Sequence, residues 1–270
     1  MPDDIVRLLT GSGSWVLVFA HPGHELRAYH LMERVQPAVA VLTDGSGSAN
    51  TPRVTESRAL LAQVGATPVE PFGSLTDRDA YAALIAADAR PFMNQVDTLT
   101  ALLTAGHVRA IVMDAAEGYN PLHDVCHWIA RAAALRARQS GVDVVLLELD
   151  LIAHPDGSGD GHRLVLDDRA FARKLGATSR YGPLKHEADA AFERHGVDAF
   201  RVEFVRRVAG SPPPPSSWTP YYEEVGKARV RAGIYPSVLG YGSHVRPVIE
   251  RLLAGVQPRH HAADLHPVHE

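Results

Sequence analysis

A short, uncharged run of apolar residues, Trp15–Phe19, is the feature that most limits how this chain can fold. Its β-branched and aromatic side chains predict a strand that is buried on both faces rather than a helix. Similar runs recur at residues 37–43, 67–72, 108–113 and 142–149. Because helical stretches separate them, we expect parallel strands joined by right-handed crossovers. The predicted fold is therefore α/β, a Rossmann-like three-layer sandwich with a mainly parallel sheet.

The segments of helical composition fill the intervals between strands and continue to the end of the chain. They are residues 25–35, 53–63, 78–87, 91–104, 125–139, 167–177, 183–195, 221–232 and 244–253. In the less regular second half, further strands are expected at residues 163–166 and 200–205. The run Pro212–Pro215 predicts a stiff, extended spacer. We expect a catalytic domain over residues 1–210, followed over residues 211–270 by the spacer and C-terminal helices that pack on the same domain.

Composition limits the classes of partner. The 270-residue chain has a formal charge of −4, which gives no electrostatic reason to expect nucleic acid or an anionic membrane surface as a partner. No apolar stretch approaches about 18 residues, so no membrane span is expected. The acidic start, Met1–Asp4, lacks the basic segment of a signal peptide, and a single cysteine, Cys126, fits a reducing compartment. We expect a cytoplasmic protein that acts on a small molecule, with homo-oligomer formation left open.

The stretch that follows the first strand is the main candidate for chemistry. Residues 20–25 read Ala-His-Pro-Gly-His-Glu, and Pro22 and Gly23 end the strand and bend the chain. His21 and His24 are thereby placed at the carboxyl end of a buried strand, the edge at which open α/β sheets bind ligands. This spacing is typical of a metal site, although hydrogen-bonded loop histidines would produce the same pattern.

A third ligand is expected from another loop at the same edge. A polar loop further along the chain contains His123, whereas His127, one helical turn later, is expected to pack against Trp128. Three nitrogens from His21, His24 and His123 leave positions open for water and substrate, as at catalytic zinc. We therefore predict a site for zinc or for another divalent metal such as iron.

These motifs resemble those of the LmbE/PIG-L family of zinc-dependent N-deacetylases. That family has Ala-His-Pro-Asp-Asp-Glu after its first strand and a later His-Pro-Asp-His. This chain has His-Pro-Gly-His-Glu at residues 21–25 and Asn-Pro-Leu-His at residues 120–123. Residues 42–45 match the family's Thr-x-Gly turn, and the helix from Arg53 resembles its Arg-x-x-Glu helix. The resemblance covers residues 13–205 and implies a Rossmann-like sandwich, in agreement with the alternation of strands and helices.

Departures from the family pattern alter the expected chemistry of the site. The resemblance implies that His21 and His123 are metal ligands, while His24 takes the place of a ligand aspartate. The family's general-base aspartate falls on Gly23, which has no side chain. Three neutral ligands around a divalent metal leave a charge of about +2, which is expected to acidify water more strongly than the family's site of about +1.

Replacement catalytic groups are sought near these positions. In the second motif, Asn120 replaces an oxyanion-stabilising histidine and Leu122 replaces the aspartate that supports it. Glu117 is the preferred replacement base, because it lies on the loop just before the third ligand, and Asp44 is the second choice. Tyr119 and Asn120 are expected to polarise a carbonyl oxygen. Asp44 also precedes a glycine, so a turn role is equally expected there.

Three further polar residues receive a role at this stage. Arg53 is predicted to help bind a polar substrate, because family members use this region near their substrates. Asp124 is predicted either to cap the following helix or to orient a histidine. Asp114 is another candidate base. These residues complete the predicted site.

Three functions are compatible with these residues. The first is a deacetylase-like, metal-dependent hydrolase that cleaves an amide or another acyl bond in a small polar metabolite, sugar-linked metabolites included. The second is a metal enzyme of another class, such as a lyase or hydratase, which the loss of the family's base favours. The third is a non-catalytic binding protein, against which the new ligand at His24 argues.

Overall fold

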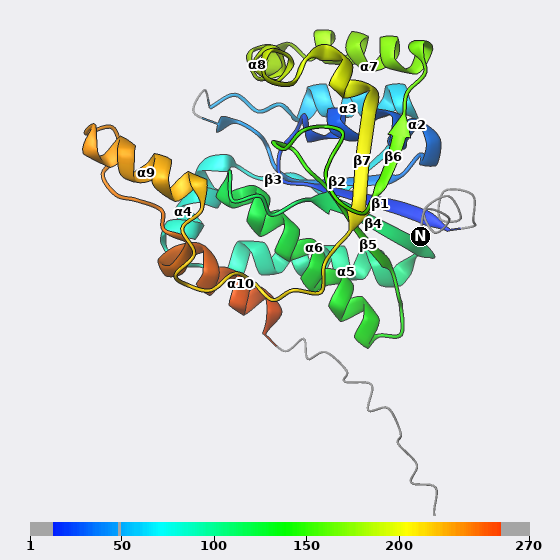
Figure 1. The fold of residues 1–270 in the computed structure, drawn as a ribbon. Coiled ribbons are helices and arrows are strands. Elements are labelled where there is room, and N and C mark those ends of the chain that lie inside the picture. Colours follow the sequence, from blue (N-terminus) through cyan, green and yellow to red (C-terminus); the bar gives the residue numbers. More distant parts are fainter. Residues whose placement is uncertain (1–12, 48–49, 255–270) are drawn as a thin grey trace, which may run out of the picture.

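The architecture is a sheet between two layers of helices (Figure 1). The computed structural model describes residues 13–47 and 50–254. Residues 1–12, 48–49 and 255–270 lie outside the described residues, and with them the last part of the segment expected over residues 211–270. The sheet has seven strands in the order β3-β2-β1-β4-β5-β7-β6.

The strands follow the predicted apolar runs closely. They are β1 (Ser14–Phe19), β2 (Ala38–Thr43), β3 (Thr67–Leu75), β4 (Val108–Asp114), β5 (Val145–Leu149), β6 (His162–Val165) and β7 (Val202–Arg207). β1 pairs in parallel with β2 and β4, β2 with β3, and β4 with β5. β7 runs antiparallel to β5 and β6. The prediction of an α/β fold with a mainly parallel sheet is confirmed.

The central strands are buried on both faces. Residues 15–19 are at most 3% exposed. Val16 and Val18 belong to the apolar cluster on one face of the sheet, and Leu17 and Phe19 belong to the cluster on the other. A strand covered on both faces has no need of alternating polar residues, which explains the uninterrupted apolar run in the sequence.

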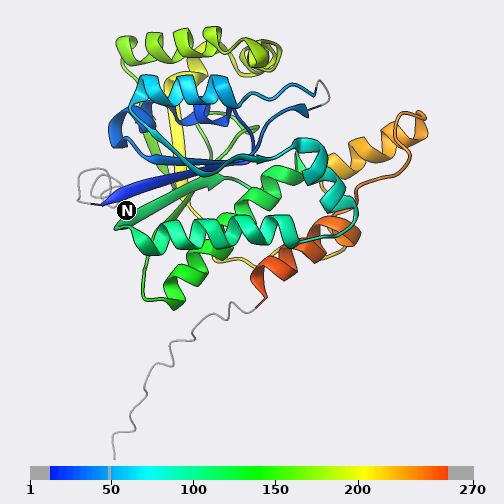
Figure 2. The same cartoon turned by 180° about the vertical axis from the view of Figure 1, so that it is seen from behind.

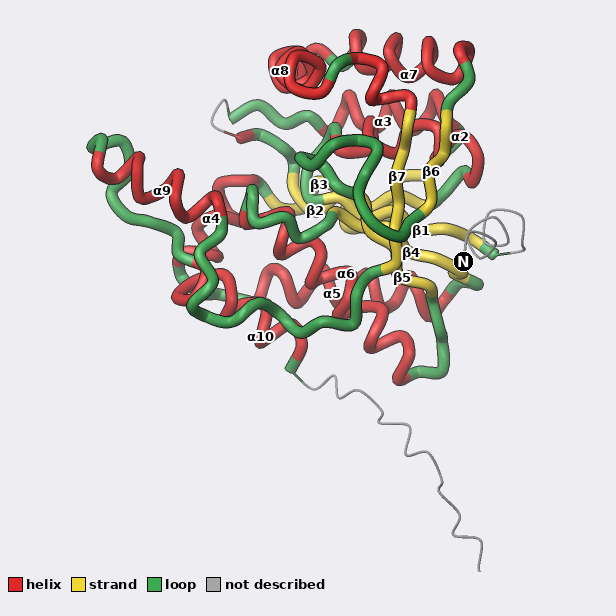
Figure 3. The backbone as a smooth tube through the Cα atoms, in the orientation of Figure 1, coloured by secondary structure: helices red, strands yellow, loops and turns green. Residues whose placement is uncertain are grey.

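Helices cover the two faces as separate groups (Figures 2 and 3). One face carries η1 (His24–Ala28), α2 (Tyr29–Val35), α3 (Val54–Val64), α7 (Asp168–Arg180), η3 (Gly182–Leu184), α8 (Lys185–His195) and η4 (Val197–Arg201). The other face carries α5 (Arg90–Ala105), α6 (Pro121–Gln139) and α10 (Arg246–Leu253), while α4 (Asp77–Ile85), α9 (Tyr221–Arg231) and η5 (Tyr241–Val245) lie at one end. Because the helices lie over the two faces, connecting loops lie at the carboxyl ends of the parallel strands.

Helix α6 begins four residues earlier than the sequence predicts. A start at Val125 is expected, but the helix starts at Pro121. The Asn120 side chain accepts a hydrogen bond from the Leu122 N–H at 2.8 Å and so caps the helix. Proline suits the first turn because it has no N–H to satisfy. His123 therefore lies in a helical turn rather than in a loop, which limits its freedom.

The C-terminal segment returns to the main body. α9 projects from the domain, whereas α10 packs against α6 (Figure 1). Tyr241, Val248 and Leu252 join the apolar cluster on that face. Within the described part of the chain, no helix combines the length and the apolar character needed to cross a bilayer.

Candidate functional site

The three predicted metal ligands lie together at the carboxyl edge of the sheet. His21 and His24 follow β1, and His123 lies in the first turn of α6. The ring centroid of His21 is 5.3 Å from those of His24 and His123, and the latter two are 4.6 Å apart. His21 and His123 are each only 6% exposed. The fold thus gathers side chains that are far apart in sequence.

The turn after β1 depends on glycine. Gly23 has a φ of +107°, a conformation that side-chain-bearing residues rarely adopt, and an added Cβ would lie 1.9 Å from Leu184 Cδ1. The buried carboxylate of Glu25 accepts the Gly23 N–H at 2.7 Å and is also bonded to the Ser57 hydroxyl. Leu184 therefore fills the space into which the family's general-base aspartate would project.

Two buried carboxylates orient two of the three rings. His21 Nδ1 lies 2.8 Å from Thr43 Oγ1 and 3.1 Å from Asp77 Oδ1. His24 Nδ1 lies 2.8 Å from Asp114 Oδ2. An acid that accepts the Nδ1–H of an imidazole leaves the Nε2 lone pair free to bind a metal, an arrangement common around metal sites.

Burial governs the protonation of this cluster. It lowers the pKa of His24 well below the usual value, helped by the charge of His21, and it lowers the pKa of His123 in the same way, helped by His24. Burial raises the pKa of Asp114 to about 6. For Asp77, burial acts to raise the pKa, but the hydrogen bond and charge of His21 outweigh it and lower the pKa. Neutral imidazole is the form that binds metals.

Several atoms of the cluster have no hydrogen-bond partner. His21 Nε2, His123 Nδ1 and Asp114 Oδ1 are buried and unpaired. Buried polar atoms are paired in the great majority of cases, so these atoms point to a missing ligand. Ligand nitrogens about 2.0–2.1 Å from a tetrahedral metal would place imidazole centroids about 5 Å apart, close to the separations given above. The donor set therefore fits a divalent metal.

The coordination geometry itself is incomplete. Among the residues that the structure describes, no group of three or more histidine, cysteine, aspartate or glutamate side chains could hold a metal ion as it stands. The separations of the three ring centroids nevertheless match those of three imidazoles around one metal. Metal binding therefore stays a prediction, and the types of donor atom in the cluster agree with it.

The acidic partners change the expected charge of the site. The value of about +2 assumed three neutral histidines with no nearby acids. Asp77 and Asp114 instead contact the outer nitrogens of His21 and His24. Because two carboxylates offset that charge, the expectation of unusually acidic water loses its physical basis.

Glu117, the preferred base, has its carboxylate bound to backbone. It accepts hydrogen bonds from the N–H groups of Leu151, Ile152 and Ala153 at distances from 2.7 to 3.2 Å. Burial raises the pKa of Glu117. These contacts hold the loop after β5 in place. Glu117 therefore has a structural role. Its role as catalytic base stays a prediction.

The second candidate base, Asp44, supports one of the acid–histidine pairs. Its Oδ1 accepts the N–H of Ser46 at 2.9 Å and the N–H of Asp77 at 3.1 Å. It therefore has the turn role that was equally expected, and it fixes the start of α4, from which Asp77 reaches His21.

The two candidates for carbonyl polarisation differ in environment. Asn120 Oδ1 caps α6 and also accepts a hydrogen bond from the Tyr81 hydroxyl at 3.3 Å. Tyr119 is 39% exposed and stacks on Tyr221 with ring centroids 5.2 Å apart. Asn120 is held beside the histidines, whereas Tyr119 faces outward.

Arg53, the predicted substrate-binding residue, lies close to the histidines. Its Nε is buried without a partner. A Cβ on Gly45 would meet both Arg53 Nε, at 2.8 Å, and Pro22 Cδ, at 2.7 Å. The Arg53 charge is near enough to contribute to the lowered pKa of His24. An unpaired guanidinium nitrogen at this place supports a role in binding a polar substrate.

The roles of Asp77 and Asp114 were missed by sequence reasoning. The sequence indicates Asp114 only as a candidate base, and it predicts that Asp124 caps α6 or orients a histidine. Asp124 instead accepts the N–H of Gly118 at 3.0 Å. The available signal was position, because Asp114 ends β4 and Asp77 follows β3 by two residues.

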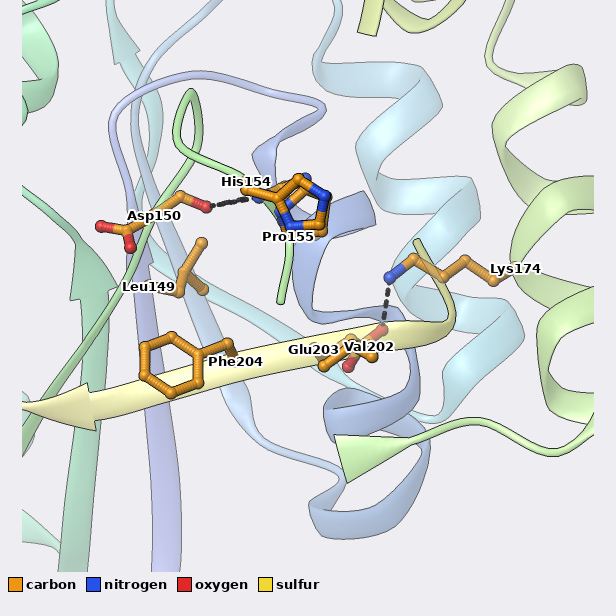
Figure 4. A pocket seen from close by; sticks show the side chains of 9 residues that line it. Leu149, Asp150, His154, Pro155, Lys174, Val202, Glu203 and Phe204 are labelled. Atoms are coloured by element: carbon orange, nitrogen blue, oxygen red, sulfur yellow. Dashed lines mark hydrogen bonds and ion pairs between the residues drawn. The ribbon is translucent and has the colours of Figure 1, made fainter. Parts of the chain in front are cut away.

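Two cavities lie away from the triad formed by His21, His24 and His123. One, of about 10 Å³, is lined by Arg27, Leu149, Asp150, His154, Pro155, Lys174, Val202, Glu203 and Phe204 (Figure 4). This volume suits about one water molecule. The other is a groove of about 420 Å³ lined by Glu70, Pro71, Ser74, Leu75, Pro91, Asn94, Gln95 and Thr98. Neither includes a histidine of the triad, so cavity size does not identify the candidate site.

Comparison with protein-family models gives no match, and comparison with curated proteins finds no match either. The resemblance to LmbE/PIG-L proteins therefore rests on the motifs alone, and the function is argued from the site.

Proposed function

We propose that this protein is a metal-dependent hydrolase that cleaves an amide or another acyl bond in a small polar metabolite, sugar-linked metabolites included. The observation that carries this proposal is the cluster of His21, His24 and His123, two of which contact a buried acid. Its position at the carboxyl edge of a parallel sheet, where such folds bind ligands, supports it further.

His21, His24 and His123 would hold the metal. When bound, a divalent ion such as zinc or iron supplies Lewis-acid polarisation of a carbonyl group and acidification of water. Asp77 and Asp114 keep the Nδ1 protons of their histidines in place.

Two further residues would act on the substrate. The Arg53 guanidinium would bind a polar group of the substrate. Asn120, whose Oδ1 is used within the protein, retains its amide N–H groups as donors to a carbonyl oxygen.

A second candidate, a metal-dependent lyase or hydratase, is favoured by one observation. Leu184 occupies the space beside Gly23 where the family's base would project, and Glu117 and Asp44 are both engaged by backbone N–H groups. A site in which the two preferred candidate bases are already engaged suits a reaction that needs no separate base to activate water.

Metal analysis of the purified protein tests the proposal. We expect about one divalent ion per chain, lost in His24→Ala and His123→Ala and retained in His154→Ala, which alters an exposed histidine outside the cluster. The metal-loaded protein should release acetate from N-acetylated amino sugars, and a chelator should stop the release. Failure to load any metal would contradict both candidates. Metal binding without acetate release would favour the lyase or hydratase.

A further inference from the structure

Asp114 occupies a buried position at the end of β4, the strand that lies between β1 and β5 in the sheet. It is the last residue of β4, beside the end of β1, where Val18 and Met113 are register partners. Its side chain is fully buried. Oδ2 accepts the Ala20 N–H at 2.7 Å and lies 2.8 Å from His24 Nδ1. The carboxylate therefore joins the backbone just before the His-Pro-Gly-His turn to the second histidine of that turn.

We infer that Asp114 is a positioning residue that allows a histidine to serve as the second metal ligand where a carboxylate would otherwise be needed. The inference rests on the proposed function, because it concerns the same metal. Position 24 is an aspartate in the family that the motifs resemble. In this protein the negative charge lies not on the ligand at position 24 but on Asp114, whose side chain holds that ligand.

Two physical effects follow from this placement. The carboxylate accepts the Nδ1–H of His24, so that Nε2 is the nitrogen with a free lone pair. It also places a negative charge behind the ring, which makes the imidazole a stronger donor and offsets the charge of a bound cation. Asp114 Oδ1 has no partner of its own, so the surroundings do little to divert this charge.

The same geometry makes residues 24 and 114 interdependent. An aspartate at position 24 would place a second carboxylate beside buried Asp114 with no imidazole N–H between them, and two like charges in one buried site repel each other. His24→Asp alone would therefore restore the family's ligand type and yet bind metal poorly. Removal of the Asp114 charge at the same time would relieve the conflict.

Titration with Zn²⁺ against a competing chelator, and the visible spectrum of the Co²⁺-loaded protein, test the inference. Asp114→Asn keeps an oxygen that can accept the Ala20 N–H but loses the charge. We expect its zinc affinity to fall by about 10- to 100-fold and its Co²⁺ spectrum to shift. Asp150→Asn is the matched control, because Asp150 is also buried next to the end of a strand but pairs with Arg206 rather than with a histidine. It should bind zinc as the wild type does.

The double variant His24→Asp/Asp114→Asn should bind zinc more tightly than His24→Asp alone. If Asp114→Asn does not fold, ¹⁵N NMR of the metal-free wild type decides the matter, because the inference requires the His24 proton on Nδ1 and a proton on Nε2 would overturn it. Wild-type affinity in Asp114→Asn, or no gain in the double variant, would overturn the inference alone. A wild type that binds no zinc would overturn the proposed function as well.

Discussion

Two buried clusters of ionisable residues in this protein differ in how completely their atoms are paired. In the first, Lys174 and Glu203 form an ion pair at 2.9 Å, and both are under 5% exposed (Figure 4). Glu203 also accepts hydrogen bonds from the N–H groups of His30 and Leu31 at 2.8 Å each, and so caps the first turn of α2. In the second, the histidine triad, several nitrogen and oxygen atoms have no partner.

This difference is the one expected between a structural cluster and a cluster that binds a ligand. Buried polar atoms that find partners within the chain stabilise one conformation. Atoms left unpaired in a buried site cost free energy of folding unless a ligand completes them. The ion pair of Lys174 and Glu203 is therefore part of the scaffold, and the unpaired atoms of the triad support the proposal that it is the functional site.

The largest expected effect breaks the fully paired cluster. Lys174→Met leaves the Glu203 carboxylate buried without its cation, which should lower the free energy of unfolding by about 3–5 kcal/mol. Lys185→Met is the control, since Lys185 pairs with Asp189 at the surface, where such pairs contribute about 0–1 kcal/mol. Urea denaturation measures both. Equal losses in the two variants would contradict the scaffold role.

The next effect tests the space beside the triad. Gly23→Asp restores the family's base but adds a side chain at a positive φ and against Leu184, so it should cost at least about 2 kcal/mol. Gly182→Asp is the control, because an added Cβ there meets no atom within 4 Å. Adding Leu184→Ala to Gly23→Asp should recover part of the loss in thermal or urea unfolding. No recovery would show that Leu184 does not limit this space.

A pH-dependent effect concerns His127, which lies on α6 outside the triad. Glu148 Oε2 is 3.3 Å from its Nδ1, yet burial outweighs this neighbour and lowers the pKa of His127 to about 3. The unfolded chain, with a histidine pKa of about 6.5, then takes up the proton first. Stability is full above that value and is lost as the pH falls toward 3.

Between pH 7 and pH 5 this single group should remove about 2 kcal/mol from the free energy of unfolding. His127→Gln should flatten the pH dependence by that amount, and the exposed His154→Gln should leave it unchanged. Urea titrations at the two pH values measure the difference. A parallel decline in His127→Gln and wild type would mean that another group causes the loss.

The smallest effect decides to which cluster Glu117 belongs. Its carboxylate resembles that of Glu203, since both accept backbone N–H groups. Glu117→Gln should cost only about 1 kcal/mol, because an amide oxygen still accepts part of these bonds. If Glu117 is structural, acetate release by the metal-loaded variant should equal that of the wild type. A loss of release at unchanged metal content would restore Glu117 as the catalytic base.

The sequence predicted the architecture well, for local reasons. Each parallel strand of the centre is a short apolar run, and burial on both faces requires that pattern wherever the strand lies in the sheet. His21 and His24 were identified by the same local logic, because they directly follow such a strand. The predicted start of α6 is wrong by four residues, because the preference of proline for a first helical turn outweighs the loop-like composition around Pro121.

The partners of the histidines depended on tertiary structure alone. Asp77 is 56 residues from His21, and Asp114 is 90 residues from His24. Leu184, which fills the space beside Gly23, belongs to η3 and is far from Gly23 in the sequence. No periodicity or spacing encodes such contacts, because they depend on how strand ends and loops meet once the sheet has formed. The sequence by itself determined the strands and the histidines placed at their ends. Only the tertiary structure decided which acids stand behind those histidines, because long-range packing brings together residues that carry no local signal of one another.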